Sequence, residues 1–166
     1  HPRHGRIPPD QIIPLAEQTG LIRPLTRWVL NTALQQCAEW KLAGIDIHVA
    51  VNLSAYCLQD DDLRDWIKDW FEHHPLTTRH LVLEVTESAM MSDPKKAVQV
   101  LTQLDALGIH ISVDDFGTGF SSLAYLKQLP IDELKIDKSF VLEMLDNDND
   151  ALIVRSTIDL AHNLGM

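Results

Sequence analysis

Two adjacent carboxylates stand before a glycine-containing loop in the second half of this 166-residue sequence. Asp114 and Asp115 follow the run 109–113, in which apolar and polar residues alternate as in a half-buried β-strand. Gly117 and Gly119 come next, where the backbone turns freely and its N–H groups are accessible. Two acids at a strand end beside such a loop indicate a hard-cation site that faces a phosphate. The alternative is a turn with solvated aspartates, and this segment alone does not decide between the two.

Three further polar residues stand at or near the ends of other runs with strand periodicity. Asn52, Glu84 and Lys135 each occupy the parity opposite to the bulky aliphatic residues of their own run. Because the carboxyl ends of parallel strands meet at one edge of a sheet, we expect these side chains beside Asp114 and Asp115. Carboxylates gathered there would repel one another unless cations bind among them. The pattern favours a metal site over a hydrogen-bonded polar rim, and its oxygen ligands favour Mg²⁺ or Mn²⁺ over zinc.

Phosphoryl transfer is the chemistry that this set of residues suits. Two cations about 3.5–4 Å apart can generate hydroxide and stabilise the leaving oxygen. Asn52 could supply a neutral carbonyl ligand, and Lys135 could orient the attacking water or balance charge in the transition state. The alternative for Lys135 is a structural salt bridge, with Asp137 as the candidate partner.

The elements that must position these residues alternate between helix and strand. Strands are predicted over 45–53, 80–86, 109–115 and 131–136, and helices over about 10–20, 21–43, 60–71, 92–107, 123–126 and 150–164. Such repeats imply an α/β fold with a parallel sheet and right-handed crossovers. No change in composition suggests a linker, so we expect a single domain over residues 1–166.

Local signals add detail to this outline. Asp10 is expected to cap the first helix, with Pro14 in or near its first turn. Trp28 is expected to point inward from the second helix, and His110 to line the interior of the sheet. A serine at 121–122 is expected to cap the short helix that follows.

Composition limits the classes of function. The formal net charge of −10 argues against a broad surface for a DNA or RNA polymer or for an anionic membrane, but not against a nucleotide bound through metal ions. Cys37 and Cys57 have no metal-site spacing and are interpreted as buried thiols in a reducing compartment, the cytoplasm. No membrane span or signal peptide is visible. The chain starts at His1 and stops at Met166, right after a helical pattern, and is interpreted as a piece of a longer protein.

Taken together, these residues resemble the EAL-type cyclic di-GMP phosphodiesterase family. The matching stretches are IPPDQIIPLAEQTGLI, VAVNLSA, LVLEVTES, VDDFGTGFSSLAYLKQLPIDELKIDKSF and AHNLGM, which run through nearly all of the chain in the family's order. The resemblance implies a (β/α)₈ TIM-barrel-like EAL domain that hydrolyses cyclic di-GMP to linear pGpG with Mg²⁺ or Mn²⁺ in a two-metal site. It also implies a homodimer or higher oligomer, and a flanking sensor or GGDEF-type domain in the full-length protein.

The resemblance assigns metal ligands residue by residue. Asn52, Glu84, Asp114 and Asp115 match the family's ligands, and Asn52 and Asp115 are also expected to contact the substrate.

It also assigns residues that act beside the metals. Lys135 matches the catalytic lysine that contacts the water. Glu87, the second acid of EVTE, matches the residue that holds the DDFGTG loop, which in the family helps to couple dimerisation to activity. Asp137, in the KID motif, is a supporting candidate.

The sequence departs from the family at both ends. The Glu-Ala-Leu tripeptide, whose Glu is a metal ligand, is absent and belongs upstream of His1, and the EGVET stretch with a proposed catalytic base belongs beyond Met166. A (β/α)₈ barrel takes about 250 residues. We therefore expect an open partial barrel with exposed strand edges and apolar surface, which dimerises, swaps or aggregates and binds metal poorly. The alternative function is a regulatory module that binds cyclic di-GMP or a protein partner without turnover.

Overall fold

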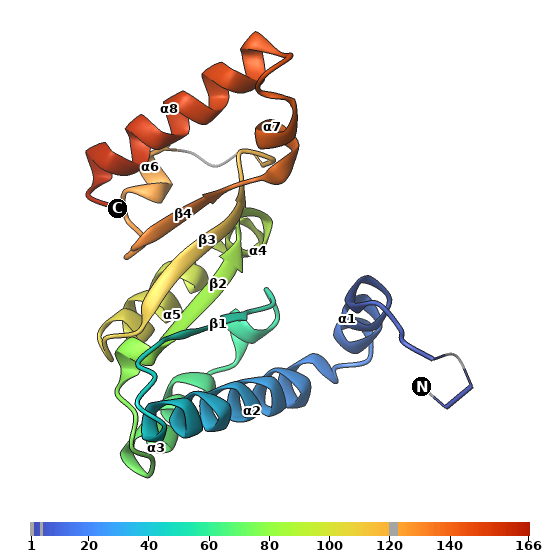
Figure 1. Ribbon diagram of the computed structural model, residues 1–166, viewed down its shortest axis with the longest axis vertical. Helices are drawn as coiled ribbons and strands as arrows, with labels where there is room; N and C mark the ends of the chain where they lie inside the picture. The colour runs from blue at the N-terminus through green and yellow to red at the C-terminus, as the bar shows by residue number, and fades with distance from the viewer. Residues whose placement is uncertain (1, 4, 120–122) are drawn as a thin grey trace.

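This chain folds into a parallel sheet with helices on its outer face (Figure 1). The computed structural model describes residues 2–3, 5–119 and 123–166. Its strands stand side by side in the order of the sequence, and each neighbouring pair is parallel. They are β1 (Val49–Asn52), β2 (Leu81–Thr86), β3 (His110–Phe116) and β4 (Glu133–Ile136). This is the predicted α/β architecture, and it corresponds to an open part of a TIM-like barrel.

The helices include two short elements that sequence periodicity did not predict. α4 begins directly after β2, and α7 begins one residue after β4. The side chains of Thr86 and Asp137 cap them by accepting backbone N–H bonds. Among the described residues, none of the helices is both long and apolar enough to cross a membrane. The helices are α1 (Pro9–Gln18), α2 (Ile22–Leu42), α3 (Leu63–Glu72), α4 (Glu87–Ser92), α5 (Pro94–Asp105), α6 (Leu123–Leu126), α7 (Lys138–Glu143) and α8 (Asp148–Leu164), with 3₁₀ turns η1 (Cys57–Gln59) and η2 (Thr78–His80).

The apolar parity of the strands packs against the helices and forms the core. Leu81, Leu83 and Val85 of β2 are completely buried, and so are Ile111 and Val113 of β3. Burying a side chain of this kind stabilises a fold by about 1.5–3 kcal/mol. This packing fixes the outer face of the sheet and leaves the opposite parity for the inner face. The core partners from α2, α3 and α5 are Leu30, Leu34, Leu63, Ile67, Leu101 and Leu104.

The first helix begins earlier than its sequence signals suggested. Pro8 is the residue before α1 and Pro9 occupies its first position, where a missing N–H is tolerated. Asp10 therefore lies within the first turn rather than at the cap, and Pro14 lies inside the helix. The acidic side chain of Asp10 still faces the positive end of the helix dipole.

The prediction that Trp28 points inward is wrong. Trp28 is 64% exposed, whereas Leu30, Leu34 and Cys37 of the same helix are buried. These three residues follow helical spacing and define the stripe of α2 that contacts the sheet. Trp28 lies away from that stripe, so its aromatic character did not predict its position. Both cysteines, Cys37 and Cys57, are buried free thiols as predicted.

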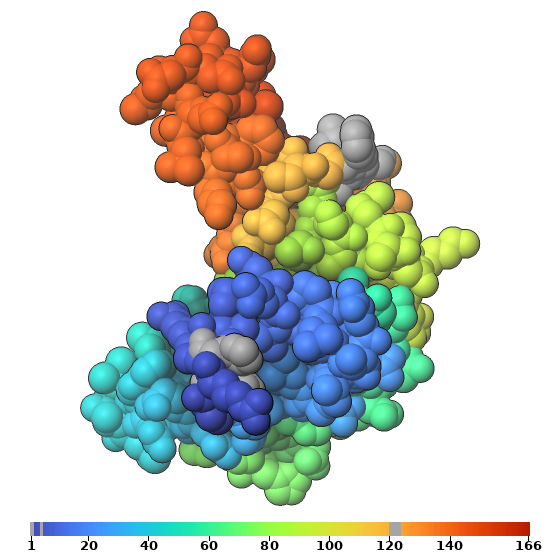
Figure 2. Space-filling model, turned by 90° about the vertical axis from the view of Figure 1, so that its right-hand side faces the viewer, coloured from blue at the N-terminus to red at the C-terminus, as the bar shows by residue number. Residues whose placement is uncertain are grey.

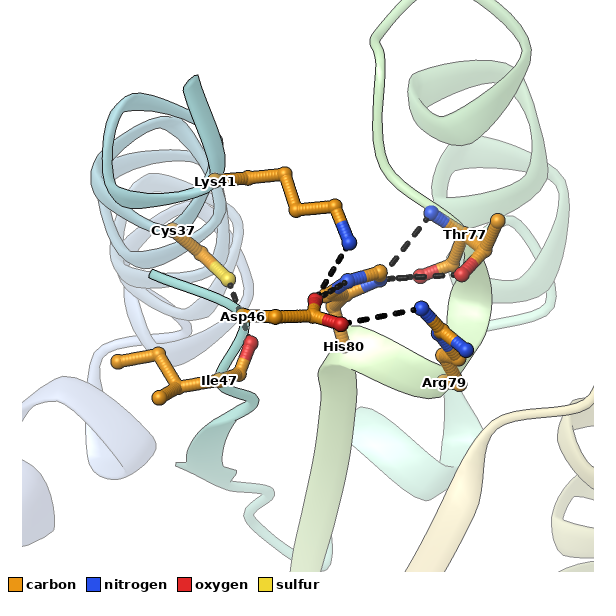
Figure 3. A network of polar contacts seen from close by, with 7 residues as sticks. All are labelled: Cys37, Lys41, Asp46, Ile47, Thr77, Arg79 and His80. Carbon is orange, nitrogen blue, oxygen red and sulfur yellow. Dashed lines mark hydrogen bonds and ion pairs between the residues drawn. The ribbon is translucent and has the colours of Figure 1, made fainter. Parts of the chain in front are cut away.

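A polar network fixes the sheet at the edge where β1 and β2 begin (Figure 3). Asp46 Oδ1 accepts a hydrogen bond from Lys41 Nζ at 2.5 Å and lies 2.9 Å from His80 Nε2. Arg79 reaches the other oxygen of Asp46 at 3.3 Å. His80 is buried, and its Nδ1 lies 2.9 Å from the carbonyl oxygen of Thr77. The network joins the end of α2 to the start of β2.

This network predicts a dependence of stability on pH. Hydrogen bonds from Lys41 and then His80 lower the pKa of Asp46 from 3.8 to about 2. Because the folded-state pKa is depressed, the contribution of Asp46 is present above the unfolded pKa and is lost as the pH falls toward 2. Asp46→Asn is expected to lower the free energy of unfolding at about pH 5, and the difference from wild type should vanish near pH 2. Urea titrations at successive pH values measure this difference.

Asp159→Asn, which changes an exposed carboxylate on α8, is the control for the loss of one charge. The interpretation is wrong if Asp46→Asn and Asp159→Asn show the same dependence on pH.

Both open edges of the sheet lie beside exposed apolar side chains. β1 and β4 are the edge strands, so one row of backbone groups on each has no strand partner in the described chain. Ile45 and Ile47 are exposed just before β1, and Leu142, Leu145 and Leu152 are exposed on and between α7 and α8. A cavity of about 240 Å³ lies between β4 and α8. Exposed apolar side chains beside a free strand edge favour association with another chain.

We therefore expect this 166-residue chain to self-associate as its concentration rises. Light scattering over a concentration series measures the average mass. The double variant Leu142→Lys and Leu152→Glu should reduce association while leaving the circular dichroism spectrum unchanged, because both side chains are exposed. A monomeric mass throughout the series would contradict the expectation.

Candidate functional site

Strand register brings polar residues of the inner parity into one row. Asn52 is the register partner of Glu84, which is the partner of Ser112, which in turn is the partner of Glu133. Neighbouring strands lie about 4.8 Å apart, so side chains in such a row are within reach of one another. Sequence reasoning singled out Asn52 and Glu84 but not Ser112 or Glu133. The sequence did contain a signal for them, because Ser112 shares the parity of Asp114 and Glu133 shares the parity of Lys135. Their position in the same row as Glu84, however, depends on strand register, which the sequence pattern does not show.

Lys135 lies in contact with Glu84 across the intervening strand β3. Its Nζ donates a hydrogen bond to Glu84 Oε1 and forms an ion pair with it. The side chain of Glu84 is only 11% exposed and that of Lys135 is 35% exposed. The salt-bridge partner is therefore Glu84 rather than Asp137. Asp137 lies just past the end of β4, where its Oδ1 accepts the backbone N–H of Ser139 at 2.8 Å.

The charge of Lys135 is stabilised by its neighbours. Partial burial works against the charged form, but the hydrogen bond and charge of Glu84 outweigh it, and the pKa of Lys135 is raised. The charge of Asp114 acts in the same direction. Lys135 is therefore a cation at neutral pH, and it balances the carboxylate with which it is paired.

A bulge in β3 sets the positions of the two aspartates. The strand runs through both acids to Phe116, one residue beyond the predicted end on Asp114 and Asp115. Its pairing with β4 shifts between Val113 and Phe116, which places Asp114 and Asp115 together opposite Lys135. Asp115 has a φ of 55°, a left-handed conformation that aspartate tolerates better than most residues. The bulge thus brings two carboxylates to one lysine.

Asp115 is electrostatically crowded. Desolvation by the neighbouring protein atoms raises the pKa of Asp115, and the negative charges of Asp114 and Asp137 raise it further, as does a hydrogen bond with Asp137. The pKa of Asp137 is lowered instead, chiefly by its hydrogen bonds from Ser139. A cation bound near Asp114 and Asp115 would relieve this repulsion.

The donor atoms present suit a hard divalent cation. Asn52, Glu84, Asp114 and Asp115 offer amide and carboxylate oxygens from three adjacent strands. Within the described part of the chain, however, no three or more His, Cys, Asp or Glu side chains are already gathered in a group that could hold a metal ion. Glu84 is engaged by Lys135, so a cation there would compete with the lysine.

Glu87 holds the glycine loop that follows β3. Its Oε2 accepts the backbone N–H groups of Gly117 at 3.0 Å and Gly119 at 3.1 Å. The side chain comes from the first residue of α4 and is 2% exposed. Hydrogen bonds from two backbone N–H groups help to offset the cost of burying a polar side chain. The structure therefore places Glu87 as a support of the loop, and the expected serine cap at 121–122 lies outside the described residues.

His110 stands at the opposite end of the inner face. It has the inner parity expected of a residue that lines the interior, yet its side chain is 58% exposed because the open sheet leaves this face uncovered. It lines a cavity of about 190 Å³ with His48, Arg79 and Asp132. Its Nδ1 lies 3.9 Å from an oxygen of Asp132.

The whole chain, residues 1–166, matches the family model described as the EAL domain. The chain belongs to the EAL domain family. MucR of Pseudomonas aeruginosa, a bifunctional diguanylate cyclase/cyclic di-GMP phosphodiesterase, is 46% identical to this EAL chain over 167 residues. The solved structure of the PaMucR phosphodiesterase in a c-di-GMP complex superposes on all of the chain with a TM-score of 0.93 at 46% identity. The EAL enzyme Bd1971, solved with cAMP and cyclic di-GMP bound, gives a TM-score of 0.91 at 35% identity over 100% of the chain.

The EAL chain is shorter than these relatives. It spans about a quarter of the length of MucR, 24%, and 68% of the solved PaMucR chain. It spans 46% of the solved Bd1971 chain. The likeness to both solved structures establishes the fold of the part that is present.

Contact between Glu87 and the glycine loop predicts a steric requirement at residue 119. A Cβ added to Gly119 would lie 2.8 Å from the carboxyl carbon of Glu87, which is closer than real Cβ contacts. Gly119→Ala is therefore expected to lower the free energy of unfolding by about 1–3 kcal/mol, the usual cost of overpacking. Denaturant titration measures the change.

A double-mutant cycle separates this clash from a general effect on the loop. In a Glu87→Ala background the clashing group is gone, so Gly119→Ala should cost much less. Equal costs of Gly119→Ala in the two backgrounds would show that Glu87 does not set the requirement for glycine.

Proposed function

We propose that this chain is part of a metal-dependent phosphodiesterase that hydrolyses cyclic di-GMP to linear pGpG. The observation that carries the proposal is the cluster of Glu84, Lys135, Asp114 and Asp115 on adjacent parallel strands of a chain that belongs to the EAL family. The c-di-GMP complex of the PaMucR phosphodiesterase supports the choice of substrate.

In this proposal the strand-end oxygens hold Mg²⁺ or Mn²⁺. Asn52, Glu84, Asp114 and Asp115 would be the ligands, since they are the hard oxygen donors of the inner face. Bound cations would lower the pKa of a coordinated water and neutralise charge on the phosphate. Asn52 and Asp115 would also contact the substrate, because both are exposed at the carboxyl edge.

Other side chains keep this site in order. Lys135 would orient the attacking water and balance the charge that develops on the phosphate, since it is a cation next to the acids. Glu87 supports the glycine loop through two backbone hydrogen bonds. Asp137 would act as a supporting residue through its hydrogen bond with Asp115 and its cap on α7.

The activity is proposed for a longer protein, in which residues 1–166 would form one partial domain. The family's Glu-Ala-Leu ligand and its downstream catalytic base have no counterpart in this sequence. Alone, the chain is expected to bind metal weakly, because Lys135 already engages Glu84. The proposal includes self-association, a cytoplasmic location, a flanking sensor or GGDEF-type domain, and no DNA or RNA polymer as a partner.

A second candidate is a module that binds cyclic di-GMP or a protein without turnover. The ion pair between Lys135 and Glu84 favours this second candidate, because the ammonium group of a lysine can take the place of a metal ion as the partner of a carboxylate. The two functions predict the same ligand and differ in product formation.

The test uses a protein extended at both ends, incubated with cyclic di-GMP and Mn²⁺, with pGpG measured by chromatography. Turnover is expected in the extended protein and should be weak or absent in the 166-residue chain. Glu84→Gln should lower turnover by a factor of about 100 or more, because a proposed metal ligand is lost. Glu133→Gln is the matched control in the same row, and it should leave turnover within a few-fold of wild type. Binding of cyclic di-GMP without pGpG formation would favour the second candidate.

A further inference from the structure

Ser54 connects the first helix to the strand that carries Asn52. Its Oγ donates a hydrogen bond to Oε1 of Glu17 at 2.6 Å and accepts the backbone N–H of Tyr56 at 3.3 Å. Both Glu17 and Ser54 are partly buried. Ser54 is separated from Glu17 by 37 positions in the sequence but from Asn52 by only one residue. The contact therefore joins an outer helix to the segment that leaves β1 at the candidate site.

Within the described residues, Asn52 has support from the sheet on one side only. β1 is an edge strand, and Asn52 is its last residue. The pairing with β2 ends one residue later, where Leu53 N–H donates to the carbonyl oxygen of Glu84 at 2.7 Å. The chain then turns, and Cys57 N–H donates to the carbonyl oxygen of Ser54 at 2.9 Å. The geometry of Asn52 thus depends on how firmly the start of this turn is held.

Helix α2 holds the later part of the same segment. Arg27 pairs with Asp60 at 3.1 Å, and Arg23 donates to the carbonyl oxygen of Gln59 at 3.3 Å. The Sγ of Cys57 lies 3.3 Å from the hydroxyl of Thr26. These contacts of α2 hold residues 57–60, at the far end of the turn. The contact of Glu17 with Ser54 holds the beginning of the turn, next to Asn52.

Helix α1 is lightly attached, so this hydrogen bond matters for its position too. Ala16 is the one buried residue of α1, while Ile12 and Leu15 are exposed. Gly20, with a φ of 73°, lies between α1 and α2. Figure 1 shows α1 standing out from the sheet on the side toward which the strand arrows point. Figure 2 views that side, where the blue surface of α1 and α2 is separated from the orange C-terminal helices by green and yellow residues.

We propose that Glu17 is a positioning residue for Asn52, acting through Ser54. The Ser54 hydroxyl bridges Glu17 and the backbone of the turn, so that α1 fixes the direction in which the chain leaves β1. A shift of α1 is then passed to the Asn52 amide. The effect of Glu17 on catalysis rests on the proposed function. The structural coupling from Glu17 through Ser54 to Asn52 does not.

The coupling is tested on the chain itself by ¹⁵N NMR of the Asn52 side-chain amide. Glu17→Ala and Ser54→Ala should each shift and broaden its resonances, and the double variant should add little because both changes remove one contact. Glu17→Gln should restore the wild-type spectrum, since its amide oxygen still accepts the Ser54 proton. Gln18→Ala, at the next position of α1, should also leave the Asn52 resonances unchanged. An unchanged Asn52 amide in both Glu17→Ala and Ser54→Ala overturns the proposal.

The same variants in the extended protein test the catalytic consequence. Glu17→Ala should raise the Mn²⁺ concentration needed for half-maximal turnover by about 10-fold or more, in the range found for residues that orient a metal ligand. Glu17→Gln should restore it. Absence of turnover in the wild type, with the NMR effect intact, rejects the proposed function and leaves the coupling supported. Normal Mn²⁺ dependence in Glu17→Ala beside an active wild type rejects the positioning role.

Discussion

The register of the parallel strands is the constraint on which the rest of this structure depends. Side chains alternate between the two faces of a strand. A slip of one residue in β2 would therefore turn Glu84 toward the apolar core on the outer face and Leu83 toward the inner face of the sheet. The burial of Leu81, Leu83 and Val85 against the helices opposes such a slip. The outer face thereby fixes the inner one. Apolar packing behind the sheet is the reason why Asn52 and Glu84 lie side by side.

Electrostatic balance at the inner face comes from one lysine and a local irregularity. Lys135 pairs with Glu84, and the bulge in β3 places Asp114 and Asp115 opposite the same residue. A regular ladder would have put a single side chain across from Lys135. The crowding that raises the pKa of Asp115 is the cost of this arrangement. It is also the feature that would make a divalent cation favourable there.

Support for the loops around this site comes from glutamates on the outer helices. Glu87 at the start of α4 accepts the backbone N–H groups of Gly117 and Gly119, and Glu17 on α1 accepts the hydroxyl of Ser54. Both carboxylates act from partly or fully buried positions, where a hydrogen bond to a charged group is stronger than in water. The network around Asp46 plays the corresponding part where the strands begin. Charged hydrogen bonds thus help to hold loops at each end of the sheet.

The sequence by itself determined the alternation of strands and helices, the core-facing parity of the strands, and the family. Residue parity and the resemblance of the EVTE, DDFGTG and KID segments were enough to select Asn52, Glu84, Glu87, Asp114, Asp115, Lys135 and Asp137 as candidates. Only the tertiary structure decided that Lys135 pairs with Glu84, that Ser112 and Glu133 share their row, and that Glu17 reaches Ser54. Periodicity reports which face a side chain occupies within its own element. Register, the bulge in β3 and the docking of α1 depend on contacts between residues far apart in the chain, which local patterns do not encode.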